Sequence, residues 1–267
     1  MRTNAVKAAL KQGMPQVGTW LSLGNVVAAR FLARAGFPWL TVDLEHSHTD
    51  IQTAAHMFAA IADAHTDCLP LARVPSARHD HIKRALDCGA MGVVVPMVMN
   101  GGEARMMVAA TRYPPQGDRS VGGNLHALNA DASPSVYYQR ANNEILTVLQ
   151  IEHIKAVEVA DDITSVPGVD AIFVGPNDLA ASMRAADGTP PTTDEFEAAL
   201  TAIRQSCERH GVAPGLHVFS VEEAQQRIDQ GWRFLALNSD LKFLLDAASA
   251  ASRVFHPDRA SGDLAKY

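Results

Sequence analysis

Short apolar runs alternate with segments of helical periodicity along almost the whole chain. The apolar runs read as buried strands, because they are brief and are bounded by Gly, Pro or polar residues. They occupy residues 19–21, 39–43, 69–74, 91–95, 145–152, 171–174, 213–218 and 234–237. Helical patterns occupy residues 25–35, 50–62, 79–88, 101–111, 155–164, 194–210, 221–230 and 239–254, and a polar tail follows.

Strands that alternate with helices pair in parallel. About eight such units in 267 residues predict a single-domain α/β fold over residues 1–267, a closed (β/α)8 or TIM barrel. The alternative is a doubly wound open sheet. That fold would require a Gly-rich nucleotide-binding loop after the first strand, and residues 21–25 do not form one. Residues 112–138 are rich in Pro and Gly, so we expect a long loop there, a feature that is often functional.

Composition narrows the class of function. The net charge of −6 offers no basic surface for nucleic acid. No apolar run has the length to span a membrane, and the first residues do not resemble a signal peptide. The three cysteines form no CxxC pair, which argues against a disulfide framework and a thiolate zinc site. We therefore expect a soluble cytoplasmic protein.

Polar side chains gather at the carboxyl ends of the predicted strands, where the active site of a barrel lies. This observation holds without reference to any other protein. The residues concerned are Asp43, Glu45, His46, Arg73, Gln150, Glu152 and Asp178.

Glu152 and Asp178 form a plausible site for a hard cation. Two carboxylates without a thiolate suit Mg²⁺ or Mn²⁺, which keep positions open for substrate oxygens. Asp178 also follows the turn Gly175-Pro176, and Asn177 resembles the N-cap of a helix, so an anion could bind beside the carboxylate. The alternatives are that Asn177 and Asp178 only cap a helix and that Glu152 pairs with Lys155.

Three further residues are candidates for the chemistry. Arg73 could stabilise an oxyanion or bind a carboxylate, or it could simply pair with Asp43 or Glu45. His46 changes its charge near neutral pH, so it is the natural general base. Asp87 could orient the His46 ring, or it could be a solvent-exposed residue at the end of its helix.

Seven segments, in order, resemble the HpcH/HpaI aldolase family of metal-dependent pyruvate aldolases. The similarity spans about residues 17–245, and several ordered motifs make it specific. The segments are Val42-Asp-Leu-Glu-His46, Ala72-Arg-Val-Pro75, Leu86-Asp87, Val95-Pro-Met97, Thr111-Arg-Tyr-Pro-Pro-Gln-Gly117, Leu149-Gln-Ile-Glu152 and Val174-Gly-Pro-Asn-Asp-Leu179.

The resemblance implies a reversible cleavage of a 4-hydroxy-2-oxo acid to pyruvate, through its enolate, and an aldehyde. It implies that Glu152 and Asp178 hold a divalent cation, for which we expect Mg²⁺, Mn²⁺ or Co²⁺, and that pyruvate chelates it. The remaining implied roles are enolate stabilisation by Arg73, catalytic base for His46 with Asp87 as its partner, and substrate binding by Gln150 and by the backbone from Gly175 through Pro176 and Asn177 to Asp178. It also implies a homo-oligomer, commonly a hexamer, with the C-terminal helix packed on a neighbouring subunit.

The sequence departs from the family at Leu44, where many relatives have Gly, and at residues 124–129. We expect that loop, with Arg119, to face the aldehyde, so the identity of the aldehyde stays open. A citramalyl- or malyl-CoA lyase on the same barrel is an alternative. Such an enzyme binds a bulky acidic cofactor and would require basic residues around the barrel opening, but the long loop has few apart from Arg112 and Arg119. A binding barrel without catalysis is a further alternative, yet none of the expected residues is missing.

Overall fold

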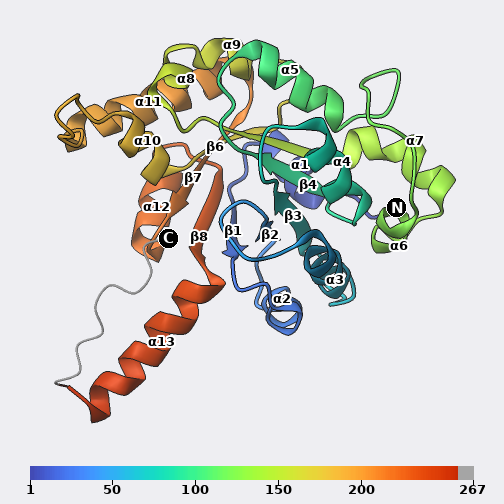
Figure 1. Ribbon diagram of the computed structural model, residues 1–267, viewed down its shortest axis with the longest axis horizontal. Coiled ribbons are helices and arrows are strands. Elements are labelled where there is room, and N and C mark those ends of the chain that lie inside the picture. Colours follow the sequence, from blue (N-terminus) through green and yellow to red (C-terminus); the bar gives the residue numbers. More distant parts are fainter. Residues whose placement is uncertain (258–267) are drawn as a thin grey trace.

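Eight parallel strands form a closed barrel in the computed structural model of the chain, which describes residues 1–257. Each strand pairs with the next along the chain, and β1 closes the ring by pairing with β8 (Figure 1). The strands are β1 Gln16–Leu21, β2 Trp39–Asp43, β3 Leu69–Arg73, β4 Gly92–Val95, β5 Leu146–Gln150, β6 Ala171–Val174, β7 Ala213–Val218 and β8 Phe234–Ser239.

Helices surround this barrel and connect its strands. They are α1 Ala5–Lys11, α2 Val26–Leu32, α3 Ile51–Ala62, α4 His79–Asp87, α5 Gly101–Ala110, α6 Leu125–Asn129, α7 Pro134–Glu144, α8 Ile154–Glu158, α9 Ala160–Thr164, α10 Pro176–Ser182, α11 Thr193–His210, α12 Val221–Asp229 and α13 Asp240–Phe255. The predicted closed barrel is therefore confirmed, and the open sheet is excluded.

Aromatic side chains fill much of the barrel interior. Trp39 stacks on Phe234 with ring centroids 4.4 Å apart, and Trp20 stacks on Phe173 at 5.0 Å. All four rings are buried, so they contribute apolar area to the interior of the barrel. Trp20 and Phe173 lie toward the carboxyl ends of their strands, so they also form the inner surface of the pocket described below.

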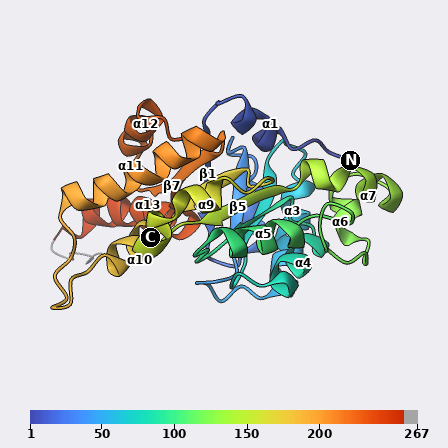
Figure 2. The same ribbon diagram turned by 90° about the horizontal axis from the view of Figure 1, so that it is seen from above.

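The amino end of the barrel is covered by α1. Lys7 of this helix donates a hydrogen bond to the carbonyl of Ile145 at 2.8 Å and pairs with Asp170 at 2.9 Å. Figure 2 shows α1 above the strands and α10, which begins at the carboxyl end of β6, below them. One end of the barrel is thus closed, and the other remains for a site.

All eight predicted strands are present, with small differences at their ends. The predicted long loop at residues 112–138 is wrong in part, because it contains α6 and the start of α7. Pro134 is one of the residues that suggested this loop, but it is the first residue of α7, where its missing N–H costs nothing, and Ser133 caps the helix. The helix predicted at residues 155–164 is divided into α8 and α9 at Val159.

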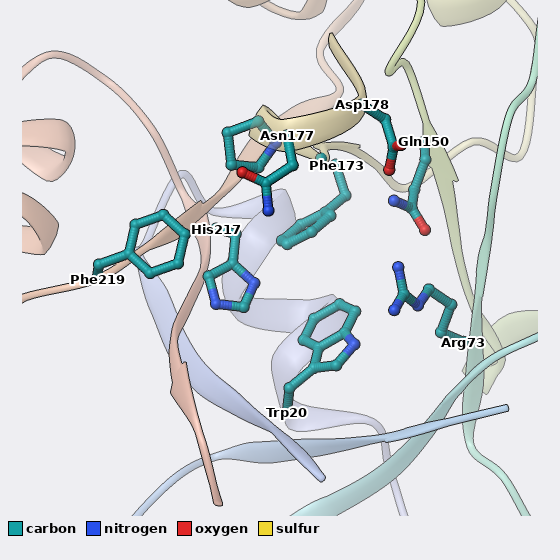
Figure 3. A pocket seen from close by; sticks show the side chains of 10 residues that line it. Trp20, Arg73, Gln150, Phe173, Asn177, Asp178, His217 and Phe219 are labelled. Carbon is teal, nitrogen blue, oxygen red and sulfur yellow. The ribbon is translucent and has the colours of Figure 1, made fainter. Parts of the chain in front are cut away.

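The helix after β6 begins earlier than predicted. Gly175 is the N-cap of α10 and Pro176 is its first residue, so Asn177 is not the cap. Proline suits the first position because its φ is already helical. As a result, Asp178 lies within the first turn of α10 and points toward the barrel mouth (Figure 3).

The last helix, α13, extends away from the barrel in Figure 1. Asp240, which accepts hydrogen bonds from the Ser22 backbone and hydroxyl, is its one buried residue. Part of the predicted polar tail falls on residues 258–267, outside the described residues. None of the helices within residues 1–257 has both the length and the apolar character needed to cross a membrane.

Candidate active site

A pocket opens at the carboxyl ends of the strands, between β1, β3, β5, β6 and β7 (Figure 3). One side is polar and carries Arg73, Gln150 and Asp178. The other side is aromatic. The residues that line the pocket are Trp20, Arg73, Gln150, Phe173, Gly175, Pro176, Asn177, Asp178, His217 and Phe219. Six of the predicted site residues are therefore brought together around one space.

Arg73 is buried and held by two carboxylates. Its Nε and Nη2 donate to the two carboxylate oxygens of Asp43 at 2.9 and 2.5 Å, and its Nη1 lies 3.3 Å from Glu45. The ion pairs considered from sequence are thus present. They do not remove Arg73 from the site, because the same guanidinium lines the pocket.

Glu152 lies just beyond the end of β5, and its side chain is almost completely buried. Its Oε1 accepts a hydrogen bond from the backbone N–H of Met97 at 2.8 Å, and its Oε2 accepts one from Gln150 Nε2 at 2.7 Å. A Cβ placed on Gly175 would stand 2.5 Å from Glu152 Oε2. Glycine at position 175 is therefore what leaves space for this carboxylate.

Several acidic side chains lie around Glu152. Burial raises the pKa of Glu152 to about 7, and the carboxyls of Asp178 and Glu45 add to this effect although Met97 and Arg73 oppose it. Burial also raises the pKa of Glu45, with Asp43 and Asp178 acting in the same direction and Arg73 and His46 against it. Burial, and the neighbouring carboxyls after it, therefore favour the protonated forms of Glu45 and Glu152.

These residues fit a divalent cation. Glu152 and Asp178 present carboxylate oxygens, and the buried Gln150 Oε1 has no hydrogen-bond partner among residues 1–257. Within residues 1–257, no group of three or more His, Cys, Asp or Glu side chains is arranged to hold a metal. A cation here would accordingly use two protein carboxylates and complete its shell with water and substrate oxygens, as Mg²⁺ commonly does.

His46 lies in an adjoining pocket together with Ser22, Asp43 and Ser239. Trp20 and His217 line both pockets, so the two spaces share a wall. The His46 Nε2 lies 3.9 Å from Glu45, and its side chain is partly exposed. The predicted base is therefore near the carboxylate cluster and open to a substrate, and its role stays a prediction.

Asp87 and Arg119 pair with each other. Arg119 Nη2 donates to Asp87 at 2.7 Å, and its guanidinium lies 4.5 Å from the Tyr113 ring and 5.8 Å from the Tyr137 ring. Arg119 is completely buried and is not among the residues that line the pocket at the barrel mouth. Asp87 is the last residue of α4, about 12 Å along the helix from its start. The predicted Asp87–His46 pair and the predicted contact of Arg119 with the aldehyde stay predictions.

The aromatic side of the pocket was missed from sequence. Trp20, Phe173 and His217 belong to strands, and Phe219 follows β7 directly. Within an apolar strand, the pattern does not separate a ring that lines a pocket from one that fills the core. His217 carried a usable signal, since it is a titratable residue inside an otherwise apolar strand.

A closed barrel with acidic, amide and guanidinium groups at the carboxyl ends of its strands is the arrangement of a (β/α)8 enzyme. The chain belongs to the HpcH/HpaI aldolase/citrate lyase family, whose profile matches residues 16–247. The family predicted from the seven segments is confirmed by this match.

The relatives agree with this assignment. The chain is 38% identical over 253 residues to a hydroxypyruvate/pyruvate aldolase of Paraburkholderia phytofirmans, covering 93% of this chain and 96% of that protein. It is 38% identical over 254 residues to a 4-hydroxy-2-oxo-heptane-1,7-dioate aldolase of Escherichia coli, covering 94% and 95%. A crystal structure of a family protein from Burkholderia cenocepacia superimposes with a TM-score of 0.87 at 33% identity, covering 95% of this chain and 100% of that one.

Proposed function

We propose that this protein is a divalent-metal-dependent pyruvate aldolase, a carbon–carbon lyase. Its reaction is the reversible cleavage of a 4-hydroxy-2-oxo acid to pyruvate and an aldehyde. The observation that carries the proposal is the convergence of Arg73, Gln150 and Asp178 on one pocket at the barrel mouth, where Gln150 also donates a hydrogen bond to Glu152. The names of relatives at 38% identity support the same reaction class.

Glu152 and Asp178 would hold the cation, and Gln150 would fix Glu152 through its hydrogen bond. A bound divalent cation supplies Lewis-acid polarisation of the substrate keto oxygen. The buried guanidinium of Arg73 would stabilise the enolate oxygen that develops on cleavage. Asp43 holds that guanidinium in place before substrate arrives, so little reorganisation is needed during the reaction.

The turn from β6 into α10 would bind the substrate carboxylate. Gly175, Asn177 and Asp178 carry backbone N–H groups at the start of α10, whereas Pro176 has none to give. Unpaired N–H groups at the start of a helix favour an anion. We therefore propose that the carboxylate of a 2-oxo acid binds beside Asp178, with its keto oxygen toward Arg73.

His46 would act as the base, directly or through a water molecule. In the cleavage direction it takes the proton of the 4-hydroxyl, the C3–C4 bond breaks, and its electron pair remains on C3 as the pyruvate enolate. Protonation at C3 then gives pyruvate. Asp87 would assist as the partner of His46, and Arg119 would contribute to binding the aldehyde. No Schiff-base lysine is required by this route.

The CoA-lyase alternative is weakened by the positions of two arginines. Arg112 and Arg119 are the basic residues of the segment that could have bound an acidic cofactor. Both are buried, and they pair inside the protein with Asp170 at 3.6 Å and Asp87 at 2.7 Å. They are therefore unsuited to hold a bulky polyanion at the barrel mouth.

The exposed surface of α13 bears on how this protein assembles. Residues of α13 that would suit a partner are exposed, among them Leu244, Val254 and Phe255, the last with 78% of its surface accessible. A helix with exposed apolar side chains suits a contact with a second copy. We therefore propose a homo-oligomer, a hexamer by family resemblance, in the cytoplasm.

Exchange of the pyruvate methyl protons in D₂O tests the proposal without knowledge of the aldehyde. Measurement by NMR after EDTA treatment, and again with Mg²⁺, Mn²⁺ or Co²⁺ restored, should show exchange only with metal. Absence of exchange with every metal, in protein whose fold is intact by circular dichroism, would contradict the aldolase assignment.

A further inference from the structure

A separate cavity lies at the amino end of the barrel, at the opposite end from the candidate active site. It is lined by residues of α1, α11 and the turns that lead into β7 and β8. Figure 2 shows α1, α11 and α12 on this side of the strands. The volume of the cavity is about 310 Å³, which falls at the lower end of the range for small-molecule sites. The cavity is therefore large enough for a ligand of its own.

The floor of this cavity is apolar. Leu10 of α1 and Cys207 of α11 line it together with Val212, Ala213 and Pro214 at or beside the start of β7, and all five residues are buried. Burial raises the pKa of the Cys207 thiol, so the sulfur is uncharged and adds to the apolar surface. A ligand with an apolar part would release water from this surface, which favours binding.

The rim of the cavity is basic. Lys11, Arg204 and Arg233 lie around it, and Glu208 is the single acidic residue that lines it within residues 1–257. The Lys11 side chain is exposed and makes no hydrogen bond or ion pair with the described part of the chain. Glu208 lies 3.7 Å from Arg204, with 77% of its side chain accessible. Three positive charges against one negative therefore surround the cavity, in a chain whose net charge is −6.

Arg233 is held in place with one edge of its guanidinium free. Its Nη1 donates to the backbone carbonyls of Ile228 and Trp232, both at 2.9 Å. Its Nε and Nη2 donate no hydrogen bond within residues 1–257, and together they match the two oxygens of a carboxylate or phosphate. Arg204 reaches the same turn, since its Nη1 lies 3.7 Å from the position that a Cβ on Gly231 would occupy. The rim thus offers a fixed donor pair and a second guanidinium to an acidic group.

We propose that this cavity binds a small organic anion. The apolar body of the ligand covers the floor, and its carboxylate or phosphate group meets the guanidinium groups of Arg233 and Arg204 and the ammonium group of Lys11. The site is distinct from that of the proposed aldolase reaction, because none of the residues assigned to that reaction lines the cavity. Because the bound anion joins α1 to α11 and to the turn before β8, it should also stabilise the folded chain.

The amide NMR signal of Gly211, which lines the cavity, reports occupancy without any turnover. His210-Gly211 is the single His-Gly pair in the sequence, so labelling with ¹⁵N-glycine and carbonyl-¹³C histidine identifies this amide directly. Benzoate and phenyl phosphate are the probes, and each should shift the signal in a saturable way. The probe that binds more tightly assigns the acidic group as a carboxylate or a phosphate. No saturable shift with either probe up to about 20 mM would overturn the proposal.

Two further probes test the two halves of the site. Benzamide keeps the shape of benzoate without its charge, and inorganic phosphate has a charged head group without an apolar body. Benzamide should bind at least about tenfold more weakly than benzoate, and inorganic phosphate more weakly than phenyl phosphate. Binding of benzamide as tight as that of benzoate, or of inorganic phosphate as tight as that of phenyl phosphate, would contradict recognition by the rim or the floor and overturn the proposal.

Charge-changing variants at the rim locate the site. Arg204→Gln and Lys11→Gln should each weaken binding of the tighter probe about threefold, whereas Glu208→Gln should strengthen it by a similar factor. Arg105→Gln is the matched control, because Arg105 is an exposed helix residue that does not line the cavity. Equal affinities in Arg204→Gln, Glu208→Gln and wild type would overturn the proposal. None of these measurements depends on turnover, so their failure is distinct from a failure of the pyruvate exchange that tests the aldolase assignment.

Discussion

Asp43 and Arg73 lie opposite each other on the paired strands β2 and β3, and their side chains form a bidentate ion pair at the carboxyl end of the barrel. The backbone pairing of β2 with β3 therefore fixes the distance across which the guanidinium and the carboxylate meet. Because both groups are buried, the pair is rigid, and the orientation of Arg73 toward the pocket depends on the sheet itself.

Arg73→Lys should lower kcat by about a hundredfold or more. A lysine ammonium is a point charge that cannot contact both oxygens of Asp43 and still face the enolate. The kcat is measured by steady-state kinetics with the aldehyde that gives the highest kcat/KM in the wild type. Arg78→Lys is the control, because Arg78 is exposed and pairs with its neighbour Asp80. Near-normal rates in Arg73→Lys would remove Arg73 from the chemistry.

Glu152→Gln or Asp178→Asn should abolish metal-dependent turnover and weaken metal binding at least about a hundredfold, since each removes one of two carboxylates. Titration with Mn²⁺ followed by electron paramagnetic resonance measures the binding directly. Glu208→Gln, a change of the same kind at an exposed position, should bind as wild type does. Wild-type affinity in both site variants would refute the assignment of the ligands.

Gly175→Ala should weaken metal binding although no ligand is changed. The new methyl group would stand 2.5 Å from Glu152 Oε2, which must move or lose its hydrogen bond from Gln150. We expect a tenfold or greater rise in the Kd for Mn²⁺, with the far-ultraviolet circular dichroism unchanged. Gly122→Ala is a suitable control, because a Cβ at that position meets no atom of the described part of the chain within 4 Å. Equal affinities in the two variants would count against a tight fit around Glu152.

His46→Ala should slow carbon–carbon cleavage far more than it weakens pyruvate binding. The base acts in the transition state, whereas the 2-oxo acid is bound by other groups. We expect kcat to fall about a hundredfold or more while the Kd of pyruvate changes less than threefold. His56→Ala, on the exposed face of α3, should leave both quantities close to wild type. Equal losses in kcat and affinity would instead give His46 a positioning role.

His217 should make the protein less stable in mild acid. Its folded pKa of about 4 lies below the value of 6.5 for a free histidine, so the unfolded chain binds the proton more readily. The stability contributed is complete above pH 6.5 and is lost as the pH falls toward 4, by up to about 3 kcal/mol. Urea unfolding of wild type and His217→Leu at pH 7 and 4.5 checks this, since the variant should lose less stability. Parallel losses would contradict it.

The fold was predictable from sequence because buried parallel strands are apolar on both faces. The run at 171–174 is such a strand, and every predicted strand has its counterpart in the barrel. The secondary structure of the segment after α5 was harder to predict. Its Pro and Gly residues indicate turns, yet Pro134 begins a helix, because a proline breaks a helix only in its interior.

The polar half of the site was also predictable, because a strand that ends in a charged residue shows where the chain leaves the barrel. Arg73 was placed by this rule, and Asp178 by the apolar strand and the turn that precede it. The partners within the site were not predictable. That Gln150 binds Glu152, or that Arg119 is enclosed by Tyr113 and Asp87, depends on side-chain packing between segments far apart in the chain.

The crowding of acidic groups around one guanidinium has a consequence for how this protein can evolve. Burial, and neighbouring carboxyls after it, raise the pKa values of Glu45 and Glu152, so keeping these two acids ionised makes the folded chain without ligands less stable. Ligands that bind only the folded state increase the free energy of unfolding by mass action. Substitutions that neutralise one of these acids should therefore be common among heat-stable variants and rare among active ones. Stability and function are thus in conflict within a single cluster of side chains.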